Sequence, residues 1–131
     1  MTKVDLLNIT KQYLLAVQEG ATGDRLAAFY TSDAQQEEFP NRLIPTGAQR
    51  DLAAVLAGAE RGQALMASQT YELVNSIIEG NRVAIEVLWT GTLRSAVPGF
   101  PAVMKARFGM FIEFEGTRIR RQHNYDCFEP W

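Results

Sequence analysis

The stretch YELVNSIIEGNRVAIEVLWTGTL, residues 71–93, decides the fold of this chain. Its two halves are rich in β-branched and aromatic residues, and Glu79-Gly80-Asn81 between them is typical of a tight turn. In the second half apolar residues alternate with others, so that one face carries Val83, Ile85, Val87 and Trp89. The stretch therefore predicts a long β-hairpin with strands at residues 71–78 and 83–93.

Two further strands are predicted after this hairpin. A loop of proline and glycine at residues 97–101 precedes an apolar stretch at residues 103–114. Glu115-Gly116-Thr117 then turns the chain into a last strand at residues 118–128. The four strands follow one another through short connections, which predicts an antiparallel meander.

The part of the chain before the hairpin is predicted to be mostly helical. Apolar residues recur at three- and four-residue steps over residues 4–19, which indicates an amphipathic helix that ends at Gly20. A second, short helix is expected from Gly23 to Tyr30, with Asp24 as its cap. The two helices would form a hairpin.

A short strand and a long helix are expected between that helical hairpin and the β-hairpin. Residues 33–39 show no helical period and lead into Pro40, which disfavours helix in the residue before it. Residues 42–47 are interpreted as a turn or a second short extended piece. Thr46 and Gln49 have the spacing of a capping box, which predicts a helix over residues 49–67.

This order of elements predicts a single α+β domain over residues 1–131. Helices followed by a run of strands favour an antiparallel sheet over a βαβ arrangement. Because long strands joined by tight turns twist and curl, the helices can pack into the concave side of the sheet and leave a cavity at its open end.

Composition argues against several classes of function. The net charge of −2 and the pI near 5.4 give no field that would attract nucleic acid or an anionic membrane, so neither partner is expected. Cys127 is the only cysteine, which excludes an intrachain disulfide and fits a reducing, cytoplasmic location. His123 is the only histidine, and no metal site is expected. The polar residues within positions 1–20 argue against a signal peptide or a spanning helix.

Several strings in this order carry a resemblance to a known superfamily. They are YLLAV at residues 13–17 followed by Gly20, LAAFY at 26–30, Asp33-Ala34, Glu37-Glu38, and NYDCFEPW at 124–131. Together they resemble the nuclear transport factor 2-like superfamily, in its SnoaL-like (polyketide cyclase-like) and ketosteroid isomerase-like branches. The resemblance implies a cone-shaped, curved antiparallel sheet with the N-terminal helices in its concave face, also described as cystatin-like.

The resemblance also implies roles for individual residues. In ketosteroid isomerases a tyrosine on the first helix and a protonated aspartic acid donate hydrogen bonds to the enolate oxygen, while a second carboxylate shuttles the proton. The tyrosine corresponds to Tyr13 and the shuttling carboxylate to Glu38. The protonated acid has no counterpart, because its strand position falls on Gly109 or Met110. The full isomerase set is therefore absent.

A second branch can be compared in the same way. Limonene epoxide hydrolases use an Asp-Arg-Asp set, and the corresponding positions here are Asn124, Val87 and Trp89, so this ionic set is absent too. Asp126 lies on the face of Asn124 and could serve as the acid or base of a SnoaL-like cyclase, one pleat displaced. The predicted catalytic residues are accordingly Tyr13, Glu38 and Asp126.

The strand at residues 103–114 allows two orientations. Simple alternation would bury Phe108, Met110, Ile112 and Phe114 in the core. The register implied by the resemblance instead turns Arg107, Gly109 and Phe111 toward the pocket. In that register the apolar set needs another cover, which predicts a homodimer through the convex face of the sheet. The predicted ligand-binding residues are then Trp89, Arg107, Phe111 and Asn124.

These observations lead to two main hypotheses of function. The first is proton transfer, of isomerase or cyclase type and without a cofactor, on a cyclic or polyketide-like carbonyl compound held in an apolar pocket. The alternative is a binding or accessory domain that holds an apolar small molecule unchanged, and a protein-interaction module is a third reading. A catalytic base should titrate well above a free glutamate, whereas a carboxylate paired with Arg107 should titrate below it.

Overall fold

The computed structural model describes residues 5–131, so the predicted start of the first helix at Val4 lies outside the described residues. The elements in chain order are α1 (Leu6–Gln18), α2 (Gly23–Ala27), β1 (Tyr30–Glu38), β2 (Ala48–Asp51), α3 (Leu52–Leu65), β3 (Met66–Glu79), β4 (Arg82–Leu93), β5 (Val103–Glu115) and β6 (Arg118–Phe128). Of the helices in this range, none has the length and apolar character needed to cross a membrane.

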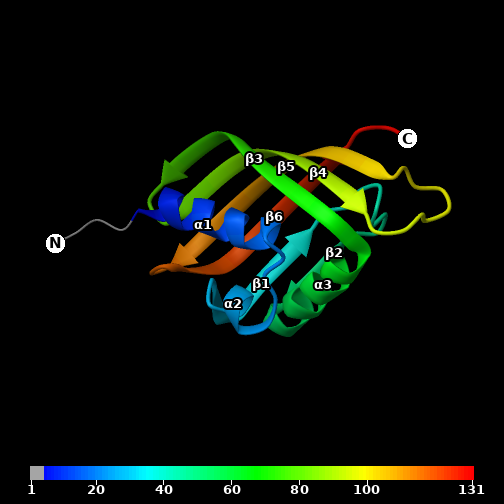
Figure 1. Cartoon of the computed structure of the whole chain (residues 1–131). Helices are drawn as coiled ribbons and strands as arrows, with labels where there is room; N and C mark the ends of the chain where they lie inside the picture. Colours follow the sequence, from blue (N-terminus) through cyan, green and yellow to red (C-terminus); the bar gives the residue numbers. More distant parts are fainter. Residues whose placement is uncertain (1–4) are drawn as a thin grey trace.

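The strands form one six-stranded sheet in the order β2-β1-β6-β5-β4-β3. The predicted meander from β3 to β6 is confirmed, and each of its neighbours pairs antiparallel. β1 adds to the free edge of β6 in parallel, a pairing that the sequence pattern did not predict. The sheet curls without closing, and the helices pack on it (Figure 1), which confirms the predicted α+β class.

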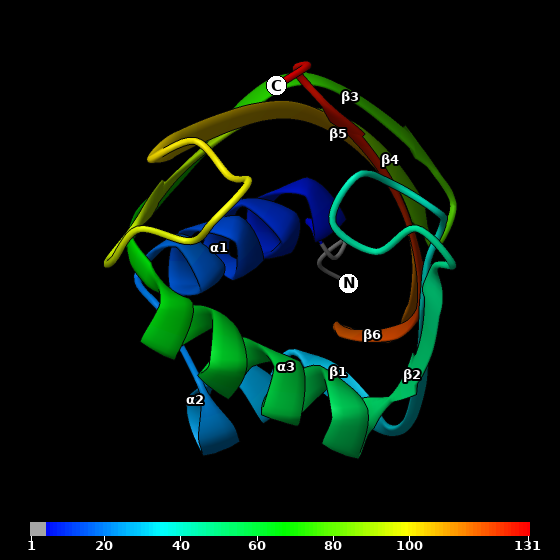
Figure 2. The same ribbon diagram turned by 90° about the vertical axis from the view of Figure 1, so that its right-hand side faces the viewer.

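The hollow side of the sheet is filled by helices. Figure 2 shows α1 inside the arch of the strands, with α3 crossing the open side below it. Asp5 is the N-cap of α1: its side chain accepts a hydrogen bond from the Asn8 backbone N–H at 3.0 Å. Its buried face includes Tyr13, Leu14 and Ala16, and it packs against β3 and β4. The N-terminal helix therefore belongs to the core and also lines the hollow side of the sheet.

The concave faces of the central strands form the core. On β4 the four alternating residues of the predicted inner face are at most 5% exposed: Val83, Ile85, Val87 and Trp89. On β5 the buried set is Phe108, Met110, Ile112 and Phe114. Burial of each such side chain stabilises the fold by roughly 1.5–3 kcal/mol. The strand therefore turns its apolar residues inward, and the register that the resemblance implied is not adopted. A shift of one residue would have exposed all four.

Two predicted pocket residues, Arg107 and Phe111, consequently lie on the convex face of the sheet, and the prediction that they turn toward the pocket is wrong. Arg107 is exposed on the convex side and pairs with Glu86 at 2.7 Å. Phe111 is 58% exposed there. Phe108 and its neighbours on β5 are already buried in the protein's own core, so they need no second subunit as a cover.

Element boundaries differ from the predictions where sheet pairing competes with helix formation. Tyr30 starts β1 and does not end α2. Residues 48–51, predicted mostly as helix, form β2, because they pair antiparallel with β1 from Gln35 to Glu38. The long helix then begins after Asp51, which caps it by accepting a hydrogen bond from Ala54 N–H at 2.9 Å. Tertiary pairing has therefore displaced the predicted cap at Thr46.

Gly91 provides a test of how tightly the core is packed. A Cβ there would lie 2.4 Å from the indole ring of Trp89 and 2.9 Å from Met66. Because both neighbours are buried, we expect Gly91→Ala to lower the free energy of unfolding in urea by about 1–3 kcal/mol.

Gly62 in α3 is a suitable control, since a Cβ there would meet no atom within 4 Å. We expect Gly62→Ala to raise the free energy of unfolding by about 0.5–1 kcal/mol through helix propensity. Equal stability of the Gly91→Ala variant and the wild type would show that Trp89 does not pack over this position.

Candidate active site

A cavity of about 360 Å³ lies between the concave sheet face, α1 and α3. Aromatic side chains form much of its wall, with Trp89 and Phe108 stacked at 5.3 Å and Phe128 edge-on to both. The residues that α3 contributes are apolar or glycine: Val55, Gly58, Ala59, Gly62 and Leu65. Polar groups therefore enter the cavity from α1, the strands and the loop after β1.

Five of the seven predicted site residues line this cavity: Tyr13, Glu38, Trp89, Asn124 and Asp126. α1 supplies the tyrosine, β1 the glutamate, β4 the tryptophan, and β6 the last two. Arg107 and Phe111 do not line it, for the reason of register given above. Period-two alternation on β6 is what brings Asn124 and Asp126 to the same side.

A pair of buried tyrosines forms the deepest polar group of the cavity. The hydroxyl of Tyr13 lies 2.6 Å from that of Tyr30, and the rings meet edge to face. Gln122 lies 3.4 Å from both hydroxyl groups. Burial is the main cause that raises the pKa of Tyr13. Burial also raises the pKa of Tyr30, and the neighbouring Tyr13 raises the pKa of Tyr30 further. Both phenols therefore keep their protons at neutral pH and can act as donors.

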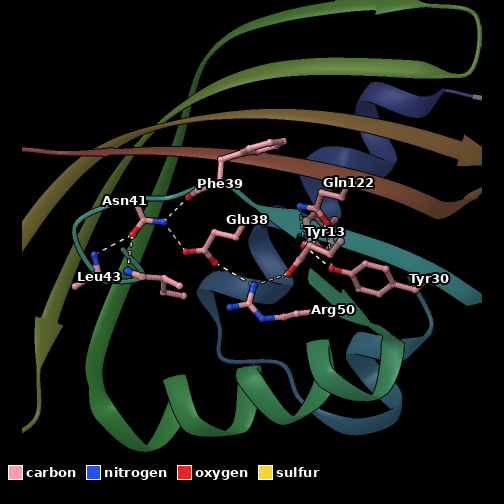
Figure 3. Close-up of polar contacts among 10 residues, drawn as sticks. Tyr13, Tyr30, Glu38, Phe39, Asn41, Leu43, Arg50 and Gln122 are labelled. Atoms are coloured by element: carbon pink, nitrogen blue, oxygen red, sulfur yellow. Dashed lines mark hydrogen bonds and ion pairs between the residues drawn. The ribbon is translucent and has the colours of Figure 1, made fainter. Parts of the chain in front are cut away.

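Glu38 is held at both of its carboxylate oxygens (Figure 3). Arg50 Nη1 donates to Glu38 Oε1 at 3.0 Å, and Asn41 Nδ2 donates to Glu38 Oε2 at 2.8 Å. Arg50 also donates to Gln36 Oε1 at 3.3 Å, and Gln36 Nε2 donates to Gln122 Oε1 at 3.2 Å. One connected network thus links Glu38 to the tyrosine pair.

Asp126 has the opposite environment. Its Oδ1, like Oδ1 of Asn124, is buried and has no hydrogen-bond partner among residues 5–131. Burial in the cavity, with a smaller contribution from the Glu38 negative charge, raises the pKa of Asp126 to about 7, although Arg50 opposes the shift. The two inward carboxylates are therefore differentiated: Glu38 is ion-paired, and Asp126 is free to exchange a proton near neutral pH.

A third polar group borders the aromatic wall. Gln69 Oε1 accepts from Trp89 Nε1 at 3.0 Å and from the Tyr71 hydroxyl at 3.2 Å. Burial, together with the neighbouring Tyr13 and Asp126, raises the pKa of Tyr71 well above its ordinary value. This cluster fixes the indole ring, so the wall next to Asp126 is rigid and largely apolar.

Sequence reasoning missed most of the polar residues of this site, among them Tyr30, Asn41, Arg50 and Gln122. Gln122 could have been found, because it shares the alternating face of Asn124 and Asp126. Tyr30 and Arg50 were assigned to helices, where strand alternation does not apply. Asn41 lies in a loop, for which no periodic signal exists. Within the described part of the chain, no group of three or more His, Cys, Asp or Glu side chains could hold a metal ion.

Comparison with solved structures shows the same fold in distant relatives. IdmH from Streptomyces antibioticus, a proposed polyketide cyclase, superposes with a TM-score of 0.77 at 18% identity, over 94% of this chain and 92% of that one. A proposed polyketide cyclase from Acidithiobacillus ferrooxidans gives 0.72 at 20% identity, over 96% and 91%. A protein with a ketosteroid isomerase-like fold from Catenulispora acidiphila, in complex with trimethylamine, gives 0.72 at 16% identity, over 89% and 83%.

These identities are low, so the superpositions establish the fold and leave activity to be argued from the site. No curated protein matches the sequence. The family model described as the SnoaL-like domain matches residues 10–122, which is most of the chain. This match agrees with the curved sheet, the enclosed helix and the predicted branch of the superfamily. The chain belongs to the SnoaL-like domain family.

Proposed function

We propose that this protein catalyses cofactor-independent proton transfer at a carbon next to a carbonyl group, on a cyclic or polyketide-like compound held in the cavity. The observation that carries the proposal is the Asp126 carboxyl group, which lines the cavity and whose Oδ1 is buried without a partner in the described chain. The same cavity contains two protonated tyrosines, Tyr13 and Tyr30. A base and oxyanion donors are the groups that enolisation requires.

The proposed step uses these residues as follows. Ionised Asp126 removes a proton from the α-carbon, and the electron pair of the broken C–H bond moves to form an enolate. The Tyr13–Tyr30 pair donates a hydrogen bond to the enolate oxygen. In an isomerase, protonated Asp126 returns the proton to a different carbon of the conjugated system. In a cyclase, the enolate carbon attacks a second carbonyl of the same molecule, and the resulting alkoxide receives the proton.

The cavity favours a small and neutral ligand. Glu38 and Arg50 form a 3.0 Å ion pair, so their charges cancel within the wall. Protonated Asp126 adds no charge, and the remaining lining is mostly apolar. A volume of about 360 Å³ is near the lower end of ligand sites, which fits a compound of one or two rings.

The second candidate function is non-catalytic binding of an apolar ligand. Glu38 favours it, because both of its carboxylate oxygens are engaged by Asn41 and Arg50, an arrangement suited to holding structure. Asp126 distinguishes the two candidates, since a binding domain has no need for a carboxyl group that titrates near neutral pH.

We also propose a homodimer through the convex face of the sheet, now for a different reason. An aromatic patch formed by Phe39, Phe111 and Tyr125 lies there: the rings of Phe39 and Tyr125 stack at 4.4 Å, and Phe111 is 6.0 Å from Tyr125. Ile77, 67% exposed, belongs to the same face. Charges of both signs border this surface, which suits an isologous contact between two copies.

Substitution Asp126→Asn tests the catalytic proposal. With a β,γ-unsaturated cyclic ketone such as 3-cyclohexenone, conversion to the conjugated enone is followed by ultraviolet absorbance. We expect kcat/KM of the wild type to rise with pH through about 7, as Asp126 ionises. Asp126→Asn should lower kcat about 10²–10⁴-fold, and Tyr13→Phe about 10²–10³-fold at most. Unchanged turnover in Asp126→Asn would refute the assignment, and ligand binding without turnover in the wild type would support the binding domain.

The same variant should be more stable than the wild type at high pH. The folded protein binds the Asp126 proton more tightly than the unfolded chain, so wild-type stability falls as pH rises from about 4 to about 7. Asp126→Asn removes this loss. We expect its free energy of unfolding in urea to exceed that of the wild type by roughly 2–4 kcal/mol at pH 8, and to equal it near pH 4. A less stable variant at pH 8 would contradict the burial argument.

The dimer is tested by Phe111→Ser. We expect light scattering to show a dimer for the wild type at micromolar concentration and a monomer for the variant, because loss of the aromatic ring removes apolar area from the contact. Leu15→Ser is a control, since Leu15 is 53% exposed on α1, away from the convex face. A monomeric wild type at micromolar concentration would contradict the proposed dimer.

A further inference from the structure

We propose that Glu38 is a positioning residue, which ties the β1–β2 loop (residues 39–47) to the cavity and places a fixed negative charge beside Asp126. This inference rests on the proposed function, in which Asp126 is the base. It assigns two new residues to the site, Asn41 and Arg50, as the groups that hold Glu38. Hydrogen bonds from Asn41 and Arg50 engage the two carboxylate oxygens of Glu38 (Figure 3).

The side chain of Asn41 organises the β1–β2 loop. Asn41 Oδ1 accepts hydrogen bonds from the backbone N–H groups of Leu43 at 2.9 Å and Ile44 at 3.0 Å, which folds the loop into a compact turn. Asn41 Nδ2 donates to Glu38 Oε2 at 2.8 Å and to the Phe39 carbonyl at 3.0 Å. A single amide therefore organises the loop and attaches it to the Glu38 carboxylate.

The β1–β2 loop contributes apolar side chains to the cavity. Leu43 and Ile44 both line it, so they form part of the surface that a ligand meets. On its outer side the loop is held by Arg42, which donates to the Trp131 carbonyl at 2.8 Å and lies over the indole ring. The inner attachment through Asn41 is the one that connects these apolar side chains to a charged group of the site.

Glu38 and Arg50 also place charges near Asp126. The titratable and charged groups that face Asp126 are Glu38 from β1, Arg50 from β2, Tyr71 from β3, and the tyrosine pair; α3, β4 and β5 contribute none to the lining. Glu38 favours the protonated form of Asp126, and Arg50 opposes it. Because both Glu38 oxygens are engaged, this carboxylate stays in place while Asp126 gains and loses its proton.

The charge effect is tested by ¹³C NMR titration of the Asp126 carboxyl carbon, which requires no substrate. We expect Glu38→Gln to lower the Asp126 pKa by about one pH unit, because the neighbouring negative charge is lost. Glu37→Gln is the matched control: it makes the same change one residue away, on the opposite side of β1, and should shift the Asp126 pKa much less. An equal shift in both variants, or none in Glu38→Gln, would overturn the charge part.

The loop attachment is tested by Asn41→Asp and backbone hydrogen exchange. Asp keeps the Oδ1 acceptor for Leu43 and Ile44 but replaces the donor to Glu38 with a second carboxylate. We expect the protection factors of these two amides to fall at least tenfold at pH 8, because the donor to Glu38 is replaced by a group that repels its carboxylate. Unchanged protection at pH 8 would overturn the attachment.

These measurements separate this inference from the proposed function. If the ¹³C titration and the hydrogen exchange give the expected results but no carbonyl compound is turned over, Glu38 still positions the loop and the charge, and only the catalytic proposal fails. If turnover depends on Asp126 but Glu38→Gln and Asn41→Asp change neither the titration nor the exchange, the catalytic proposal stands and the positioning role is refuted.

Discussion

The burial of one alternating apolar face around α1 is the constraint on which the rest of the structure depends. β4 and β5 present an uninterrupted row of large side chains to the helix, from Val83 to Trp89 and from Phe108 to Phe114. The sheet must curl to keep these rows in contact with a single helix. Curling then leaves a cavity between the sheet, α1 and α3, where the wall is aromatic and the polar groups of β1 and β6 converge.

The fold separates two carboxylates that the sequence alone could not distinguish. Glu38 and Asp126 are both acidic residues near the ends of strands, and both point inward. Their difference comes from neighbours supplied by β2 and by the β1–β2 loop, neither of which is close to β6 in sequence. Arg50 and Asn41 satisfy one carboxylate, whereas burial is the main influence on the other, with smaller effects of Glu38 and Arg50. A protein can in this way keep one charge fixed and let the second titrate.

The sequence predicted those parts of the fold in which local pattern and tertiary packing agree. The meander, α1 and the inward side of β4 follow from alternation and helical period, and the structure confirms them. Arg107 and Phe111 were misplaced because a register borrowed from distant relatives was preferred to the alternation visible in the chain itself. β2 was missed because four residues paired at the edge of a sheet carry too little pattern to compete with a helix signal. Arg50 entered the site only through that strand.

The parallel pairing of β1 with β6 has a consequence for how the molecule folds. Gln36 and Gln122 are 86 residues apart, yet their hydrogen bond joins the two halves of the polar network. Such a pairing requires the closure of a long loop, so it forms slowly and only after β6 has been synthesised. Until then β1 has an open edge on that side, available to other chains as well as to its own. The contact that brings the two carboxylates into one cavity therefore also covers an edge of β1 that could otherwise pair with another chain.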